Sequence, residues 1–310
     1  MATKYWVGGS GNWSDSTNHW ATSSGGSPAV GNMPTHLDDV VFDTSSSTAN
    51  AAYTITMDKE AFCNDFTMDG PHPSDTNKVT WAGSAILNLY GSLNLSGTSA
   101  GITRTYTGQI SLRSTSTGET ITLAGVNLAG AFATFGVGGG WTLQDALNIG
   151  SSQLSHNNGT LDTNGQTVTC GAFALSGINT RTLTLGASVI NCTSWAHTFA
   201  DNLTLNAGTS SIRITGTGAF TGNTLGTSPT FYEVQLNGTA HTVTGNNTFT
   251  NLTRTGTATK TDTVTFAGNQ TVTGTLTLAG NSATNRLLVQ SSVKGTARTL
   301  TAATVTCSNV

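Results

Sequence analysis

The chain has 310 residues and a net charge of −3, and only 9% of its residues are charged. Soluble domains usually carry about 25% charged residues. The sequence shows no cluster of basic residues for neutralising phosphates, so nucleic-acid binding is not expected. It has no apolar run of the length that a membrane span needs, so membrane insertion is not expected either.

The N-terminal quarter of the chain differs in composition from the rest, because nine of the 15 acids lie between Asp15 and Asp75. Residues 1–48 form its first part. Trp6, Trp13 and Trp20 recur at every seventh position, but the Gly, Ser, Asn and Asp between them disfavour a helix. We therefore predict turns and short strands packed around three indoles, forming an N-terminal cap or attachment segment. An exposed sugar-binding or docking surface is the alternative interpretation of the indoles.

The segment Leu37–Phe42 is predicted to be a strand, with Val40 and Phe42 on one face. Phe42 therefore joins the three tryptophans as a candidate cap or attachment residue. The segment Met1–Trp6 has no apolar signal-peptide core, so we expect the protein to be made in a cytoplasm.

The pattern W-x-G-G-x-G-x-W…W, a Gly/Pro loop and D-x-V-x-F cover about Tyr5–Phe42. This stretch resembles the opening of many bacterial and phage surface proteins built as β-helices. Residues 285–301 look like repeats of phage tail-fibre-like β-helix proteins. The resemblance implies a right-handed β-helix on a virion or cell surface, and it carries over no catalytic residue.

From Tyr53 onward, apolar residues alternate with Thr and Asn, which is typical of strands with one buried face. Gly245-Asn246 and Gly268-Asn269 are two copies of one turn, 23 positions apart. We therefore predict that residues 49–310 form a right-handed parallel β-solenoid, with coils of about 18–24 residues and on the order of 11 coils in all. The expected strands include Tyr53–Met57, Leu87–Leu89, Leu93–Leu95, Ile121–Leu123, Val126–Leu128, Leu183–Leu185, Leu203–Leu205, Ile212–Ile214, Val234–Leu236, Val264–Phe266 and Leu276–Leu278.

Three features leave alternatives open. The segment Gly136–Gly140 is favoured as a loop over a seam between two stacks of coils. Cys170 and Cys192 should stack in neighbouring coils, where two buried free thiols are favoured over a disulfide. The sequence is still strand-like up to Val310, so we expect a copy of the chain, or further chain, to cover that end.

The sequence carries little recognisable chemistry. Pairs of carboxylates can cleave polysaccharides, but scattered solvated acids are favoured over catalysis, even for Asp145 and Asp162, which could stack. The acids of the predicted solenoid are Glu119, Asp145, Asp162, Asp201, Glu233 and Asp262. A calcium site at Asp38, Asp39 and Asp43 lacks the spacing of a calcium loop, and turn capping by Asp39 is favoured. The six histidines show no metal-ligand spacing, so no metal, cofactor or catalytic residue is predicted.

These observations favour a structural protein. We expect a virion appendage (tail fibre, spike or head fibre decorating a capsid) that serves as a rigid rod for attachment or host adhesion. Its expected partners are other virion proteins, copies of itself, for example as a trimer, and a host surface glycan. The alternatives are a polysaccharide-degrading tailspike enzyme, and a bacterial surface adhesin or self-stacking extracellular filament.

Overall fold

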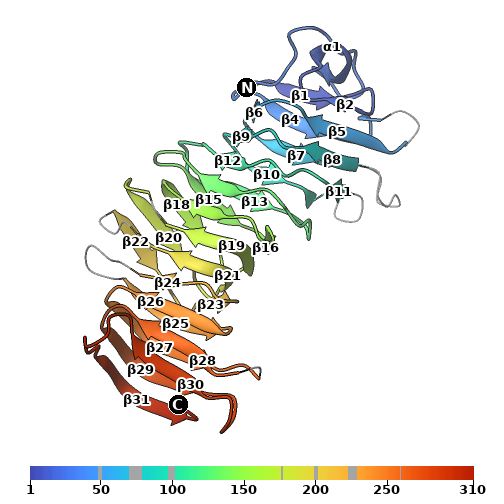
Figure 1. Cartoon of the computed structure of the whole chain (residues 1–310). Coiled ribbons are helices and arrows are strands. Elements are labelled where there is room, and N and C mark those ends of the chain that lie inside the picture. Colours follow the sequence, from blue (N-terminus) through green and yellow to red (C-terminus); the bar gives the residue numbers. More distant parts are fainter. Residues whose placement is uncertain are drawn as a thin grey trace. The chain divides into compact units, whose positions relative to one another are not determined.

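The computed structural model describes residues 1–47, 51–69, 79–96, 102–175, 177–198, 202–222, 229–258 and 260–310 (Figure 1). It confirms the fold expected from the alternation: parallel coils stack into a β-solenoid of about 10 turns. The right-handed sense of the winding stays a prediction. Helix is limited, within the described part of the chain, to the single turn α1 (Ser16–His19), and no described helix is long and apolar enough to cross a membrane.

The chain divides into two compact units, and each is described by itself. Unit 1 comprises Met1–Ser152 and Asn158–Leu161, and unit 2 comprises Gln153–Asn157 and Asp162–Val310. The boundary predicted at residue 48 stays a prediction, because residues 48–50 lie outside the described residues.

Unit 1 consists of short strands on three faces. The first face contains β1 (Thr3–Trp6), β3 (Trp20–Ala21), β4 (Asp39–Phe42), β7 (Phe66–Met68), β10 (Leu93–Asn94), β13 (Glu119–Thr122), β15 (Gly140–Leu143) and β18 (Gly159–Asp162). The second contains β2 (Gly11–Asn12), β5 (Tyr53–Met57), β8 (Val79–Gly83) and β11 (Ile102–Arg104). The third contains β6 (Ala61–Cys63), β9 (Leu87–Leu89), β12 (Ile110–Leu112), β14 (Phe132–Thr134) and β16 (Leu147–Asn148).

Unit 2 has longer strands, several of which bend around a corner and pair with two partners. The second half of β21, for example, pairs with β24, while its first half pairs with β23. The long series is β17 (Leu154–His156), β19 (Val168–Ala174), β21 (Val189–Ala196), β23 (Ser211–Thr215), β25 (Thr230–Asn237), β27 (Asn247–Thr255), β29 (Gln270–Ala279) and β31 (Leu300–Ser308). The other strands are β20 (Arg181–Thr184), β22 (Leu203–Asn206), β24 (Phe220–Thr221), β26 (Ala240–Thr244), β28 (Asp262–Phe266) and β30 (Leu287–Ser291).

The strand register confirms the repeat that the two Gly-Asn turns predict, because Phe249 lies opposite Val272, 23 positions on. The two glycines serve different purposes. Gly245 has a positive φ in the region that side chains rarely tolerate. A Cβ on Gly268 would lie 2.3 Å from the carbonyl oxygen of Gly245 in the coil next to it. Repeating the turn therefore requires glycine in both coils.

The predicted range of coil lengths is too narrow. Phe66 lies opposite Leu93, 27 positions on, and Gln270 lies opposite Leu300, 30 positions on. The extra residues lie between strands, for example between β30 and β31, so they lengthen a corner without disturbing the ladder. Alternation inside the strands cannot report such insertions.

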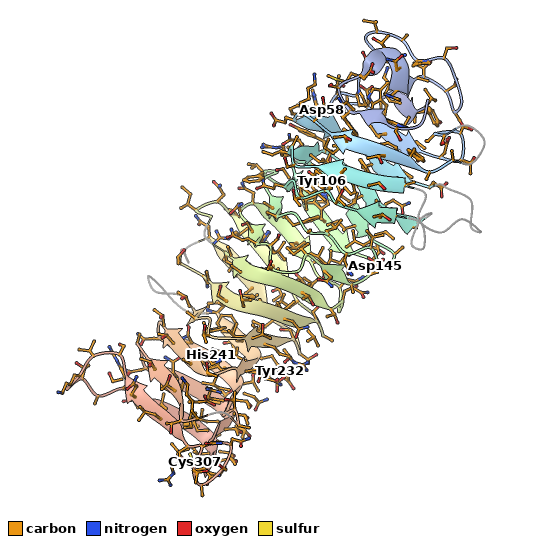
Figure 2. The ribbon with its side chains drawn as sticks, turned by 45° about the vertical axis from the view of Figure 1, so that its right-hand side comes forward. Asp58, Tyr106, Asp145, Tyr232, His241 and Cys307 are labelled. Atoms are coloured by element: carbon orange, nitrogen blue, oxygen red, sulfur yellow. The ribbon has the colours of Figure 1, made fainter. Side chains whose placement is uncertain are left out.

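Aromatic rings stack along the interior of both units. In unit 1, Trp81 lies between Phe66, with ring centroids 5.1 Å apart, and Tyr106, at 4.6 Å and 4° from parallel. In unit 2, Trp195 stacks on Phe173 at 4.8 Å. In unit 2 the column follows from parallel stacking, because Phe173 lies opposite Trp195 and Trp195 lies opposite Phe220. In unit 1 the three rings occupy different register positions, since Trp81 lies opposite Ile55 and Arg104, and they form a short column by side-chain packing alone. Figure 2 labels Tyr106 of unit 1 among the side chains.

Other expectations have mixed outcomes. Cys170 lies opposite Cys192, and both are buried free thiols, as favoured. The segment Gly136–Gly139 connects β14 to β15 as a loop. The strand predicted at Val126–Leu128 is wrong: this segment follows a turn in which the Val126 amide donates to the Leu123 carbonyl at 2.9 Å. Corners also bury alternate apolar side chains, so alternation alone does not distinguish them from strands.

Candidate functional site

The cap places all four candidate residues in its interior. Trp6, Trp20 and Phe42 have no exposed surface, and Trp13 is 1% exposed. The rings of Trp13 and Trp20 meet edge to face with centroids 4.8 Å apart, and Trp6 and Trp20 meet similarly at 5.1 Å. The indoles are therefore packed together and do not form a sugar-binding surface. Attachment through the outside of the cap stays a prediction.

Hydrogen bonds and an antiparallel pairing fix the fold of the cap. Strand β1 pairs with β3 in the antiparallel sense, so that Trp6 lies opposite Trp20, whereas β1 and β4 are parallel. The Trp20 Nε1 donates to the Trp13 carbonyl at 2.8 Å, and the Trp6 Nε1 donates to the Gly9 carbonyl at 2.7 Å. The N–H groups of these two buried indoles are thereby satisfied.

His19 explains two glycines of the W-x-G-G-x-G pattern, Gly8 and Gly11. Its ring stacks on Trp6 with centroids 4.5 Å apart and 2° from parallel, and its Nδ1 lies 2.8 Å from the Val7 carbonyl oxygen. A Cβ on Gly11 would lie 1.8 Å from the His19 Nε2. The pattern therefore records the packing of a buried ring and needs no catalytic explanation.

Two of the carboxylates considered for catalysis accept hydrogen bonds from other segments of the solenoid. Asp145 accepts hydrogen bonds from the backbone amides of Leu123 and Ala124, which belong to the coil before it. Ala124 has a positive φ, so Asp145 supports a turn in the left-handed region. Glu119 accepts hydrogen bonds from Ser92 at 2.9 Å and from Ser114 at 3.2 Å.

The other acids considered for catalysis lie in unit 2 or outside the described residues. Asp162 accepts a hydrogen bond from the Asn164 amide at 2.7 Å and lies in unit 2, whereas Asp145 lies in unit 1. Glu233 lies on β25 opposite Ser211 and Asn251. Asp201 lies outside the described residues. Asp145 and Asp162 each accept hydrogen bonds from backbone amides of turns.

The acids near β4 act on turns and on coil stacking. Asp38 accepts two hydrogen bonds from Thr35, at 2.9 and 2.7 Å, and Asp43 accepts one from the Ser45 amide at 2.8 Å. Partial burial opposes ionisation of Asp38, but the bonds from Thr35 outweigh it and lower the pKa of Asp38. The predicted turn cap at Asp39 is displaced by one residue, because Asp39 instead accepts from the Asn64 side chain of the next coil at 2.7 Å. The described residues contain no cluster of three or more potential metal ligands.

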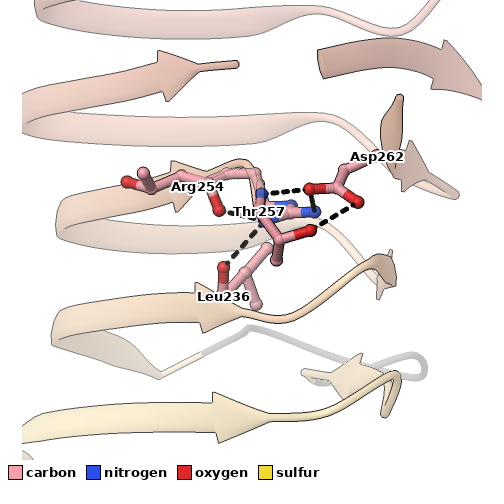
Figure 3. A network of polar contacts seen from close by, with 5 residues as sticks. Leu236, Arg254, Thr257 and Asp262 are labelled. Atoms are coloured by element: carbon pink, nitrogen blue, oxygen red, sulfur yellow. Dashed lines mark hydrogen bonds and ion pairs between the residues drawn. The ribbon is translucent and has the colours of Figure 1, made fainter. Parts of the chain in front are cut away.

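A buried ion pair in unit 2 is the main polar feature that the sequence did not reveal (Figure 3). Arg254 Nη2 lies 3.9 Å from Asp262 Oδ2, and the two side chains are 0% and 1% exposed. Thr257 donates to Asp262 through both its amide and its hydroxyl, and Arg254 donates to the carbonyls of Leu236 and Thr255. The pair closes the corner between β27 and β28. Arg254 occupies an inward position in register with Leu236 and Leu278, where alternation predicts an apolar residue.

Two buried histidines are kept neutral by their surroundings. Desolvation lowers the pKa of His156 to about 4, although its Nε2 lies 3.0 Å from the Thr182 carbonyl oxygen. Desolvation also lowers the pKa of His241, whose Nδ1 lies 2.9 Å from the Gly218 carbonyl oxygen. These contacts to backbone carbonyls give the histidines a role in holding the coils.

Comparisons with protein-family models, with curated proteins and with solved structures return no match for this chain. The geometry is therefore the whole basis for a function. It shows a scaffold of stacked coils. Buried polar groups, and carboxylates such as Asp145 and Glu119, bind neighbouring segments of this scaffold.

Proposed function

We propose that this chain is a structural protein of a virion, a tail fibre, spike or head fibre that serves for attachment or host adhesion. The observation that carries the proposal is that its polar side chains form hydrogen bonds to neighbouring segments. The carboxylates that could have served catalysis, such as Asp145 and Glu119, are bonded to neighbouring segments. Parallel coils bonded in this way leave few backbone groups for a protease to reach, which suits a surface scaffold.

The cap is proposed as the attachment end. Its interior is filled by the tryptophan cluster, so binding to other virion proteins uses the outer loops around this rigid core. Residues 1–48 carry four acids (Asp15, Asp38, Asp39 and Asp43) and one cation, Lys4, so the partner surface is expected to be basic or neutral.

Copies of the same chain are the other proposed partner. Strand β31 is nine residues long, and its side chains are exposed along most of its length, including Val305 at 56%. A long uncharged edge strand without Pro or Lys pairs readily with another chain. A further copy is one source of a strand that pairs with it and further chain is the other, and a trimer is the first homo-oligomer to test.

The deciding experiment is to locate the protein on particles. Antibodies raised against the purified chain should label a fixed position on phage particles in electron micrographs, on the tail or on the capsid. Labelling confined to the surface of bacterial cells would refute the virion assignment and favour an adhesin. A fall in polysaccharide viscosity on incubation with purified protein, abolished by replacing one carboxylate, would establish the enzyme alternative instead.

A further inference from the structure

The last coils of unit 2 carry an excess of positive charge. After Glu233 the sequence has five Lys and Arg but only one acid, Asp262. That acid is buried in its pair with Arg254 and cannot neutralise the surface. The other four cations are Lys260, Arg286, Lys294 and Arg298, and among the described residues the structure records no ion pair for any of them.

Stacking gathers three of these cations at the two edges of one sheet face. Strands β28 and β30 are parallel neighbours, with Asp262 opposite Leu287. Lys260 and Arg286 come just before the two strands, and the Asp262 amide donates to the Arg286 carbonyl at 3.0 Å. Both side chains are exposed. They therefore lie at the same edge of the face, although 26 positions separate them in the sequence.

A groove with a third cation lies at the opposite edge. The loop after β30 returns over the end of β28, where the Ser292 amide donates to the Phe266 carbonyl at 3.0 Å. The loop and the two strands enclose an open groove of about 530 Å³, lined by Thr265, Gln290, Ser292 and Lys294 among others. Ligand pockets commonly measure about 300–1,000 Å³. The groove is thus large enough for a ligand group, and its lining offers hydroxyls, an amide and an ammonium.

The face between the two edges is neutral and polar. Thr263 lies opposite Leu288 and Thr265 opposite Gln290, and the Gln290 Nε2 donates to the Thr265 Oγ1 at 3.1 Å. Leu288 is 48% exposed and adds an apolar patch. Each strand has five residues, which at about 3.3 Å per residue puts the charged edges roughly 15 Å apart. The face therefore offers hydrogen bonds and an apolar contact between two widely spaced positive charges.

We propose that the outer face of β28 and β30 binds an acidic polysaccharide, with one carboxylate in the groove beside Lys294 and another at the edge formed by Lys260 and Arg286. A carboxylated glycan combines hydroxyls, apolar C–H surface and intermittent negative charge, and the face offers a complement to each. Nucleic acid fits less well, because its charges are dense and its bases need aromatic platforms, whereas the outward residues of β28 and β30 include no aromatic ring.

The inference rests on the proposed adhesive function and names its glycan class. The test is direct binding of the full chain to polygalacturonate by biolayer interferometry at low and at physiological salt, with neutral dextran and double-stranded DNA as comparison ligands. Binding to polygalacturonate that weakens with salt, without binding to dextran, is the expected result. Absence of binding to polygalacturonate at low salt, or tighter binding to DNA, would overturn the inference.

Variants separate the face from a general effect of charge. An exposed charge contact is worth about 0.2–1 kcal/mol, or up to about fivefold in affinity, so Lys294→Gln should weaken binding by about two- to fivefold. Adding Lys260→Gln and Arg286→Gln should bring the loss to about tenfold or more. Lys59→Gln removes an exposed charge from unit 1 and is the matched control, expected to bind like the wild type. Equal losses in the control and in Lys294→Gln would refute the site.

A second variant tests the groove without altering charge. Ser292→Trp places a bulky side chain in the groove, and it should weaken polygalacturonate binding at least as much as Lys294→Gln while the melting temperature stays at the wild-type value. Unchanged affinity in this variant would remove the groove from the site. If polygalacturonate does not bind although antibodies still label the particle, the ligand inference fails and the structural function stands.

Discussion

The aromatic column of unit 1 allows a sharp test of what holds the coils together. Trp81 has no exposed surface, and it stacks between Phe66 and Tyr106. Its Nε1 is buried, and no described residue accepts a hydrogen bond from it. Trp20 is equally buried, but its Nε1 donates to the Trp13 carbonyl at 2.8 Å. The two indoles are therefore equally buried, but only the Trp20 N–H has a hydrogen-bond acceptor among the described residues.

Three substitutions should follow a fixed order of destabilisation. Trp81→Ala opens a cavity in the column and should cost about 3–5 kcal/mol in the free energy of unfolding. Trp20→Phe loses part of the ring volume and a buried hydrogen bond, whose removal adds about 1–3 kcal/mol. Trp81→Phe loses the same volume but also removes an unpaired buried N–H. The loss and the gain partly cancel, and the net cost should be about 1 kcal/mol or less.

The measurement is equilibrium urea unfolding followed by far-ultraviolet circular dichroism. With a slope of about 2 kcal/mol per molar urea, Trp81→Ala should lower the midpoint of the unit 1 transition by roughly 2 M and Trp81→Phe by less than about 0.5 M. If Trp81→Phe proves as destabilising as Trp20→Phe, the Trp81 N–H has a partner such as a buried water, and the reasoning is refuted.

Three further predictions concern buried polar groups. The pKa of His156 is about 4 in the fold and about 6.5 in the unfolded chain, so the fold loses stability as the pH falls from 6.5 to 4. The expected loss in the free energy of unfolding is up to about 3 kcal/mol. A His156→Gln variant with the same pH dependence would contradict this. Burial raises the pKa of the Cys170 thiol to about 12 and that of Cys192 well above its ordinary value, so in the native protein a thiol reagent at pH 8 should titrate one group, the exposed Cys307, and all four only in urea. Asp262→Ala should cost about 3–5 kcal/mol, because it strands the Arg254 charge, and Arg254→Met in the same chain should recover part of that loss; strictly additive losses in urea midpoints would argue against coupling of the pair.

Alternation predicted the position of most strands. Tyr53–Met57 matches β5 residue for residue and has the alternating burial of a half-buried strand. Leu87–Leu89 matches the bounds of β9, but Asn88 between the two leucines is buried as well. The spacing of the two Gly-Asn turns likewise predicted the register of their coils. Corners were not predictable in this way, since their length is set by loops that pack on the neighbouring coil. Val126–Leu128 shows the resulting error.

The buried charges were missed for a different reason. Leu252 and Arg254 both face the core, so alternation from Leu252 places Arg254 at an inward position. Its charge argues against burial, because charged side chains are rarely fully buried unless they are paired. The partner Asp262 lies across the corner between β27 and β28, and alternation gives no information on contacts across a corner.

The stacking of coils explains why the sequence shows no basic run while the structure has a cationic face. In a solenoid, the neighbours of a surface residue lie one coil before it and one coil after it. Lys260 and Arg286 are 26 positions apart, yet they precede adjacent strands at one edge. A charge pattern that binds a ligand can thus be spread through the chain with one cation per coil, and it escapes any search for clusters along the sequence. For this protein, specificity is best sought in columns of residues that share a register position, beginning with the edges of β28 and β30.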